Sequence, residues 1–61
     1  MFIRLTDLVS NPILIAVDKI VKIEVCDLDS KIYFSDGTSE IVKEPVEQIR
    51  QKLYKGSILT I

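Results

Sequence analysis

Hydrophobic and polar residues alternate through the middle of the chain, over residues 20–42, and two turn signals interrupt the alternation. This pattern is typical of β-strands with one buried face. The Asp36-Gly37 pair favours a two-residue type I′ turn, because Gly readily adopts a positive φ. A four-residue loop at residues 27–30 would precede it. The sequence therefore predicts a three-stranded antiparallel meander.

The two turns also predict which strand residues face each other. The Asp36-Gly37 turn pairs Ile32 with Ile41, and the loop at residues 27–30 pairs Ile23 with Phe34. One face of the meander would carry Ile23, Val25, Ile32, Phe34 and Ile41. The opposite face would carry Lys22, Glu24, Lys31, Tyr33 and Glu40. We predict that Ile23 and Phe34 form a cross-strand pair in the core.

The N-terminal part of the chain predicts another hairpin. Residues 1–5 alternate as a short strand, and residues 6–11 form the connecting loop. Pro12 lacks an N–H group and belongs at the start of the next strand. Residues 13–17 are continuously apolar, which is typical of a strand covered on both faces.

After residue 42 the apolar side chains recur at helical spacing, at Val46, Ile49 and Leu53. Pro45 suits the first helical position, where its missing donor costs nothing. Gly56 suits the position just after a helix. The helix should lie on the face that carries Ile23, Ile32 and Phe34. Residues 57–61 would form one more short strand.

The expected fold class is α+β: one small antiparallel β-sheet of four to five strands, a C-terminal helix and a short terminal strand. The 61 residues correspond to a single domain, residues 1–61. With 48% hydrophobic residues, the chain holds more apolar side chains than a small core buries. Oligomerisation is the usual remedy. We expect a homo-oligomer whose interface includes Ile58, Leu59 and Ile61.

The charge distribution excludes some classes of partner. Residues 1–42 hold four basic and seven acidic side chains, and residues 43–61 hold four basic and two acidic ones. An acidic sheet argues against binding a nucleic-acid polymer, which needs a basic patch. The N-terminus does not resemble a signal peptide, and no apolar run approaches a membrane span. The lone Cys26 fits a reducing compartment, so we expect a cytoplasmic protein.

Catalytic and metal chemistry are not indicated. The carboxylates of Asp27 and Asp29 resemble the start of a calcium loop, but Ile32 and Thr38 stand where that loop needs Gly and Glu. The chain has no histidine to activate Cys26 as a nucleophile. We therefore expect no enzyme activity, no catalytic residues, no cofactor and no metal.

One surface has some chemical character, the polar face of the meander around Tyr33. An aromatic ring among charges of both signs suits a partner or a small ligand. The alternative is a solvated face with cross-strand ion pairs, and it is the favoured interpretation. If the ligand were an anionic nucleotide, converging cations and an aromatic face would be required. The candidate binding residues are then Arg4, Lys22, Tyr33 and Lys43.

Several segments resemble the small flagellar protein family called FlbD or SwrD. They are the runs at residues 3–6, 12–15, 17–20 and 42–49, together with Asp36-Gly37, and the resemblance covers about residues 3–53. The first loop lacks that family's usual Asn-Gly, and Pro45 stands where a Ser is common. The resemblance implies a non-catalytic protein with a role in the flagellar motor, so a bacterial motor protein is one possible partner.

Two functions follow from these observations. The first is a non-catalytic, self-associating binding module that resembles the FlbD-like proteins. The alternative is a phage-encoded homo-oligomeric sponge, which would sequester a nucleotide immune signal between its subunits. The first requires an apolar patch with a polar rim, and the second requires converging basic and aromatic side chains.

Overall fold

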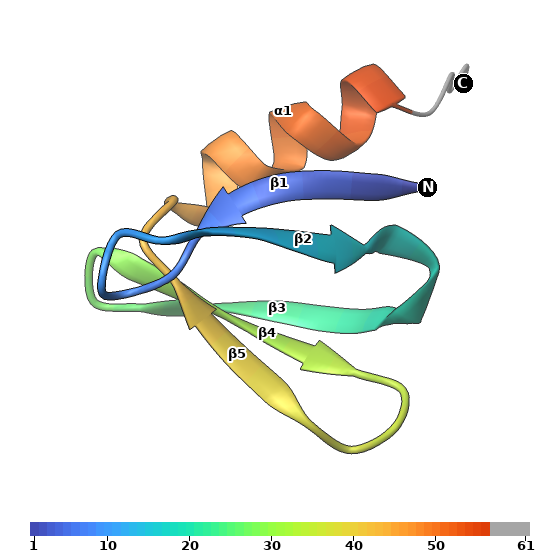
Figure 1. Cartoon of the computed structure of the whole chain (residues 1–61), viewed down its shortest axis with the longest axis horizontal. Helices are drawn as coiled ribbons and strands as arrows, with labels where there is room; N and C mark the ends of the chain where they lie inside the picture. The colour runs from blue at the N-terminus through green and yellow to red at the C-terminus, as the bar shows by residue number, and fades with distance from the viewer. Residues whose placement is uncertain (57–61) are drawn as a thin grey trace.

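The computed structural model describes residues 1–56 of the chain, and it confirms the α+β class (Figure 1). The elements run in the order β1 (Phe2–Thr6), β2 (Pro12–Ala16), η1 (Val17–Lys19), β3 (Ile20–Cys26), β4 (Asp29–Phe34), β5 (Ser39–Val42) and α1 (Val46–Gly56). The strand predicted at residues 57–61, with Ile58, Leu59 and Ile61, lies outside the described residues.

The strands form two antiparallel sheets rather than the single sheet that the sequence predicts. One sheet holds β1 and β2, and the other holds β3, β4 and β5. The short 3-10 helix η1 redirects the chain between β2 and β3. The sheets meet where β1 ends, because the Lys43 N–H donates to the Thr6 carbonyl at 2.8 Å and Asp7 forms a bridge with Val42. They therefore enclose a core between them.

The core draws its side chains from both sheets and from the helix. α1 packs against β1 and β3, and Figure 1 shows it lying along β1. The buried hydrophobic residues are Ile3, Leu5, Ile15, Ile32, Val42 and Ile49. The contact of the helix with β1 was not predicted, whereas the placement of Ile49 beside Ile32 agrees with the predicted packing.

The first hairpin forms where the sequence predicts it, with Pro12 at the start of β2. Ile3 and Ile15 pair on the inner side, and Arg4 and Leu14 pair on the outer side. The prediction that the second strand is covered on both faces is wrong, because Leu14 is 68% exposed. α1 and the second sheet cover only the inner side of this hairpin.

The turn between β4 and β5 is longer by one residue than predicted. The Phe34 N–H donates to the Thr38 carbonyl at 2.9 Å, and the Gly37 N–H donates to the Phe34 carbonyl at 3.0 Å. The loop therefore holds Ser35, Asp36 and Gly37, with Gly37 at a φ of 93°. A type I turn followed by a left-handed glycine is the common three-residue hairpin loop.

The turn between β3 and β4 is shorter than predicted. Cys26 pairs with Asp29, so only Asp27 and Leu28 form the loop. Asp27 has a φ of 58°, whereas Leu28 does not have a positive φ, which is the pattern of a type II′ turn. This position usually takes Gly, and Asp is among the residues in which a positive φ is more common.

These turns change the predicted register. Ile23 pairs with Ile32, and Phe34 pairs with Ile20 beyond a bulge, so the predicted Ile23–Phe34 pair is wrong. Four of the five predicted inner residues still share a face, because a shift by two residues preserves the pleat. The shift by one in the next hairpin exchanges Glu40 and Ile41 between the faces: Ile32 lies opposite Glu40, and Lys31 lies opposite Ile41. Val42 is buried in place of Ile41.

The helix starts one residue later than predicted, with Pro45 immediately before it. The Pro45 carbonyl accepts the Gln48 and Ile49 N–H groups at 3.0 and 3.1 Å. Proline suits this place because it needs no donor partner. The helix includes Gly56 rather than ending before it.

Candidate functional site

The polar cluster around Tyr33 exists in part as predicted, on the outer face of the three-stranded sheet. Tyr33 lies directly opposite Lys22, and its hydroxyl donates to Glu24 Oε1 at 3.0 Å. The Lys22 and Lys31 ammonium groups lie 4.8 and 5.2 Å from the ring centroid. Glu40 was also predicted here, but the change of register places it on the opposite face.

The charges of this cluster largely satisfy one another. Lys22 Nζ lies 3.3 Å from Glu24 Oε2, with both side chains about half exposed. The hydrogen bond from the Tyr33 hydroxyl, followed by the hydrogen bond and charge of Lys22, lowers the pKa of Glu24 below its ordinary value. Exposed contacts of this kind stabilise a sheet weakly. The cluster resembles a solvated face more than a vacant binding site.

The other two predicted binding residues lie elsewhere. Arg4 lies on the first hairpin, opposite Leu14. Lys43 follows β5 and donates from Nζ to Ser10 Oγ at 2.6 Å. It stands four residues beyond Ser39, the strand partner of Tyr33, which is roughly 13 Å along a strand. Within one chain, the four candidates therefore do not converge on one ligand.

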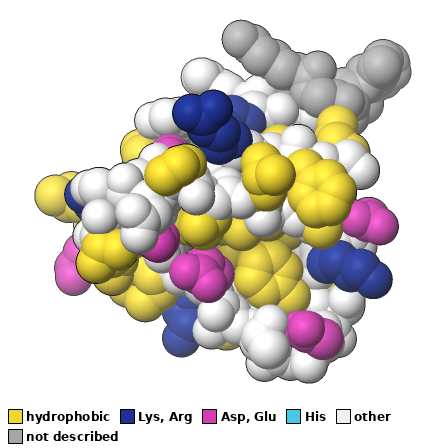
Figure 2. Space-filling model, in the orientation of Figure 1, with side chains coloured by type: hydrophobic (Ala, Val, Ile, Leu, Met, Phe, Trp, Pro, Cys, Tyr) yellow, Lys and Arg dark blue, Asp and Glu magenta, His cyan; other side chains and the backbone are white. Residues whose placement is uncertain are grey.

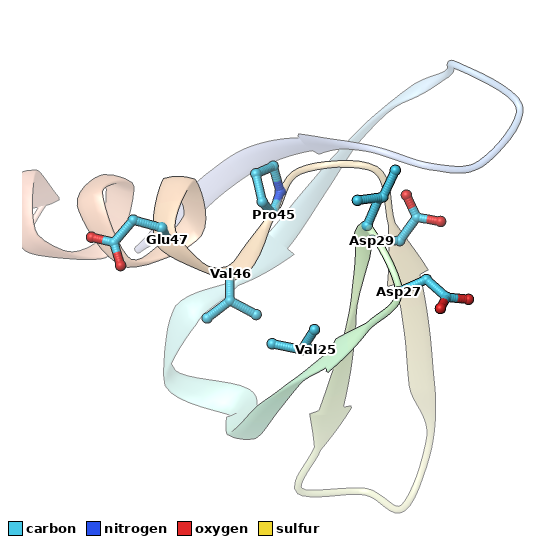
Figure 3. Close-up of a pocket in the computed structure, with 7 residues that line it drawn as sticks. Val25, Asp27, Asp29, Pro45, Val46 and Glu47 are labelled. Atoms are coloured by element: carbon cyan, nitrogen blue, oxygen red, sulfur yellow. The ribbon is translucent and has the colours of Figure 1, made fainter.

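A shallow apolar groove opens between the β3–β4 turn and the start of α1. We call it the turn groove, and Figure 3 shows Val25 and Val46 pointing toward each other across it, while the carboxylates of Asp27, Asp29 and Glu47 point outward from its edges. Val25 is 73% exposed, and Leu28 is 87% exposed. The groove is lined by Val25, Asp27, Leu28, Asp29, Pro45, Val46 and Glu47.

The acidic rim of the turn groove is not fully neutralised. Glu47 pairs with Arg50 at 3.0 Å. Within residues 1–56, neither Asp27 nor Asp29 takes part in an ion pair. An apolar centre beside uncompensated carboxylates suits a partner that brings both an apolar side chain and a cation.

The outer side of the first hairpin is a second exposed apolar surface. We call it the hairpin face, and it consists of Phe2, Arg4, Leu14 and Pro12. Phe2 is 63% exposed. Figure 2 shows hydrophobic side chains distributed over the visible surface, with basic side chains between some of them. Within residues 1–56, Arg4 has no ion-pair partner.

Sequence reasoning missed the turn groove because its two sides lie far apart in the chain. The turn carries Leu28 between two aspartates, and the helix start carries Pro45 and Val46. An apolar residue at the tip of a polar turn was a visible signal. Nothing in the periodicity indicated that the helix would begin beside this turn.

Residues 1–56 contain no group of three or more His, Cys, Asp or Glu side chains arranged to hold a metal ion. Cys26 lies at the end of β3 opposite Asp29. No helix among these residues has both the length and the apolar character needed to cross a membrane. No protein-family model, curated protein or solved structure matches this chain, so its resemblance to the FlbD or SwrD family stays a prediction.

Proposed function

We propose that this protein is a non-catalytic interaction module that acts as a homo-oligomer. The observation that carries the proposal is the balance between buried and exposed apolar side chains. In the described part of the chain, six hydrophobic residues are buried, whereas nine large ones are between 50% and 87% exposed. A small domain with this much exposed apolar surface gains stability by association.

The strand edges support the same proposal. Within residues 1–56, β2 hydrogen-bonds only to β1, and β3 hydrogen-bonds only to β4. Each therefore leaves one row of backbone groups without a sheet partner, and such edges pair readily with another chain. β3 carries a bulge between Ile20 and Lys22, which interrupts one of these edges. Apolar contact is thus a better basis for association than edge pairing along β3.

The absence of enzyme activity also belongs to this proposal. It rests on the composition, because the chain has no histidine and a single thiol. The carboxylates with lowered pKa, such as Glu24 and Glu44, are held by hydrogen bonds and are poor general bases. We also propose a cytoplasmic location, from the lone Cys26, and a motor protein as partner, from the family resemblance alone.

A nucleotide-binding oligomer is the second candidate. The observation that favours it is the pair of lysines, Lys22 and Lys31, within 5.2 Å of the Tyr33 ring centroid. A phosphate-bearing ligand could use both cations and the ring, but Arg4 or Lys43 would have to come from another subunit. Titration with a nucleotide mixture, followed by calorimetry, separates the candidates. Heat that disappears in a Tyr33→Ala variant would favour the second.

Mass in solution tests the first candidate. Light scattering across a concentration series should show a mass that is a multiple of the chain mass of 6.9 kDa. A chain that ends at Gly56 tests the predicted role of Ile58, Leu59 and Ile61 separately. An oligomer that survives this truncation must be held by surfaces within residues 1–56. A monodisperse monomer of the full chain at 100-micromolar concentration would contradict the proposal.

A further inference from the structure

The hairpin face and the turn groove are complementary in charge and in apolar character. The hairpin face presents one cation, Arg4, beside the exposed side chains of Phe2 and Leu14. The turn groove has an apolar centre and, at its outer edge, the carboxylates of Asp27 and Asp29, which take part in no ion pair within residues 1–56. The two surfaces share no residue, so one subunit can use both at the same time.

Like surfaces would pair poorly. Two hairpin faces in contact would bring two Arg4 guanidinium groups together, and two turn grooves would bring together carboxylates of the same sign. Like charges set against each other across a contact disfavour that pairing and thereby select its alternatives. A symmetric contact through either surface is therefore opposed by electrostatics.

Contact between a hairpin face and a turn groove avoids both of these repulsions between like charges. It sets the Arg4 guanidinium against the aspartates, and this group suits carboxylates because it can donate two parallel hydrogen bonds. It also sets Leu14 against Leu28, which at 87% is the most exposed of the large hydrophobic side chains in the described part of the chain. Both leucines would leave water on contact.

We propose that the hairpin face of one copy binds in the turn groove of a second copy. This inference rests on the proposed self-association and specifies its geometry. Because the two surfaces differ, the contact is head-to-tail, and an open assembly keeps one free hairpin face at one end and one free turn groove at the other until it closes. Such contacts generate rings when the rotation closes and filaments when it does not.

Two blocked variants test this geometry. Leu14→Glu places a carboxylate on the hairpin face, opposite the acidic groove. Leu28→Glu removes the apolar side chain from the groove and adds a third carboxylate beside Asp27 and Asp29. Val21→Glu is the matched control, because Val21 is 62% exposed but belongs to neither surface. Circular dichroism checks that each variant keeps its fold, and light scattering measures its mass.

The expected result is a monomer for each blocked variant and an unchanged oligomer for the control. Mixed in equal amounts, the two blocked variants should form a dimer of twice the chain mass, because each supplies the intact surface that the other lacks. The remaining hairpin face and groove in that dimer both carry a new carboxylate, so growth should stop there.

Other outcomes overturn the inference and separate its failure from that of the proposed function. A wild-type oligomer whose blocked variants keep their mass, or do not pair on mixing, rejects the head-to-tail contact alone. Loss of the oligomer in Val21→Glu, with the blocked variants unaffected, would place the contact at the β3 edge. A monomeric wild-type chain rejects self-association itself.

Discussion

Two glutamates in this protein make similar hydrogen bonds in very different places. Glu24 accepts from the Tyr33 hydroxyl at 3.0 Å on the exposed face of the meander. Glu44 accepts from the Thr6 hydroxyl at 2.8 Å and from the Thr6 N–H at 2.9 Å, where the two sheets and the helix start meet. The pKa of each carboxyl is lowered.

The difference lies in what each glutamate connects. Glu24 joins neighbouring strands that already pair in the β-sheet, nine residues apart. Glu44 joins residues 38 positions apart and ties β1 to the segment before α1. Its carbonyl also accepts the hydroxyl of Ser30, which is buried, at 2.7 Å. Similar chemistry should therefore stabilise the fold unequally, because burial and connectivity set its value.

The test with the largest expected change in stability compares the two faces of β4. Ile32 is fully buried in the core on the inner side, whereas its neighbour Tyr33 belongs to the outer cluster. Ile32→Ala should cost about 2–5 kcal/mol of unfolding free energy. A domain of 61 residues has about 3–9 kcal/mol in total, so this variant should lose a large fraction of its stability. Urea denaturation followed by circular dichroism measures the loss.

Tyr33→Ala is the matched control for that variant. It should cost less than about 1 kcal/mol, because it removes exposed cross-strand contacts. Equal losses for the two variants would mean that the outer cluster is part of the cooperative core.

The second test removes the glutamates themselves. Glu44→Ala leaves the Thr6 N–H and hydroxyl without their acceptor in a partly buried position, so it should cost about 1–3 kcal/mol. Glu24→Ala removes only exposed contacts and should cost a few tenths of a kcal/mol. Thermal melts of both variants provide the comparison. A larger loss for Glu24 would reverse the ranking.

The third test deletes only the hydroxyl donors. Thr6→Val keeps the shape of the side chain and removes its hydrogen bond to Glu44, with an expected cost of about 1 kcal/mol. Tyr33→Phe removes the hydrogen bond to Glu24 in the same way and should cost a few tenths of a kcal/mol. Chemical denaturation resolves the first change clearly. If both variants match the wild type, the two hydroxyl bonds are equivalent and add nothing to stability.

The smallest expected effect is on the dependence of folding stability on acidic pH. Partial burial raises the pKa of Glu44, but the two hydrogen bonds from Thr6 outweigh it, so the folded value lies below the ordinary 4.5. The ionised carboxyl therefore stabilises the fold fully above pH 4.5, and this contribution is lost as the pH falls through the folded value. Glu44→Gln should flatten the decline of stability in that range.

Glu24→Gln is the control for the acid experiment. The Glu24 side chain is about half exposed on the outer face of the sheet, so salt and solvent weaken its contribution and the substitution should change the pH profile less. Denaturation midpoints at pH 3 and pH 6 suffice for the measurement. A profile that flattens equally in both variants would show that burial at the junction has no effect on the proton linkage.

Much of the fold was determined by local sequence. The hairpin at β1 and β2 follows from alternation and from Pro12, and the start of α1 follows from Pro45 and the helical spacing of Val46, Ile49 and Leu53. These signals work because backbone geometry and one-sided burial act over a few neighbouring residues.

The register of the meander was decided by tertiary contacts. Asp36-Gly37 fits both a two-residue and a three-residue loop. The two-residue loop would turn Ile41 toward the core, whereas the three-residue loop turns Val42 toward it. The longer loop buries Val42 at the bridge with Asp7, where β1 and β5 meet. The local turn signal alone could not distinguish these alternatives.

The turn between β3 and β4 was decided in the same way. A two-residue loop without glycine is locally unfavourable, because Asp27 must adopt a φ of 58°. In return, the loop brings Ser30 into the strand, where its buried hydroxyl donates to the Glu44 carbonyl. It also sets Leu28 beside the helix start and so creates the turn groove. Only the folded chain brings these distant residues together, because the hydrogen bond and the apolar contacts that offset the strained turn are long-range.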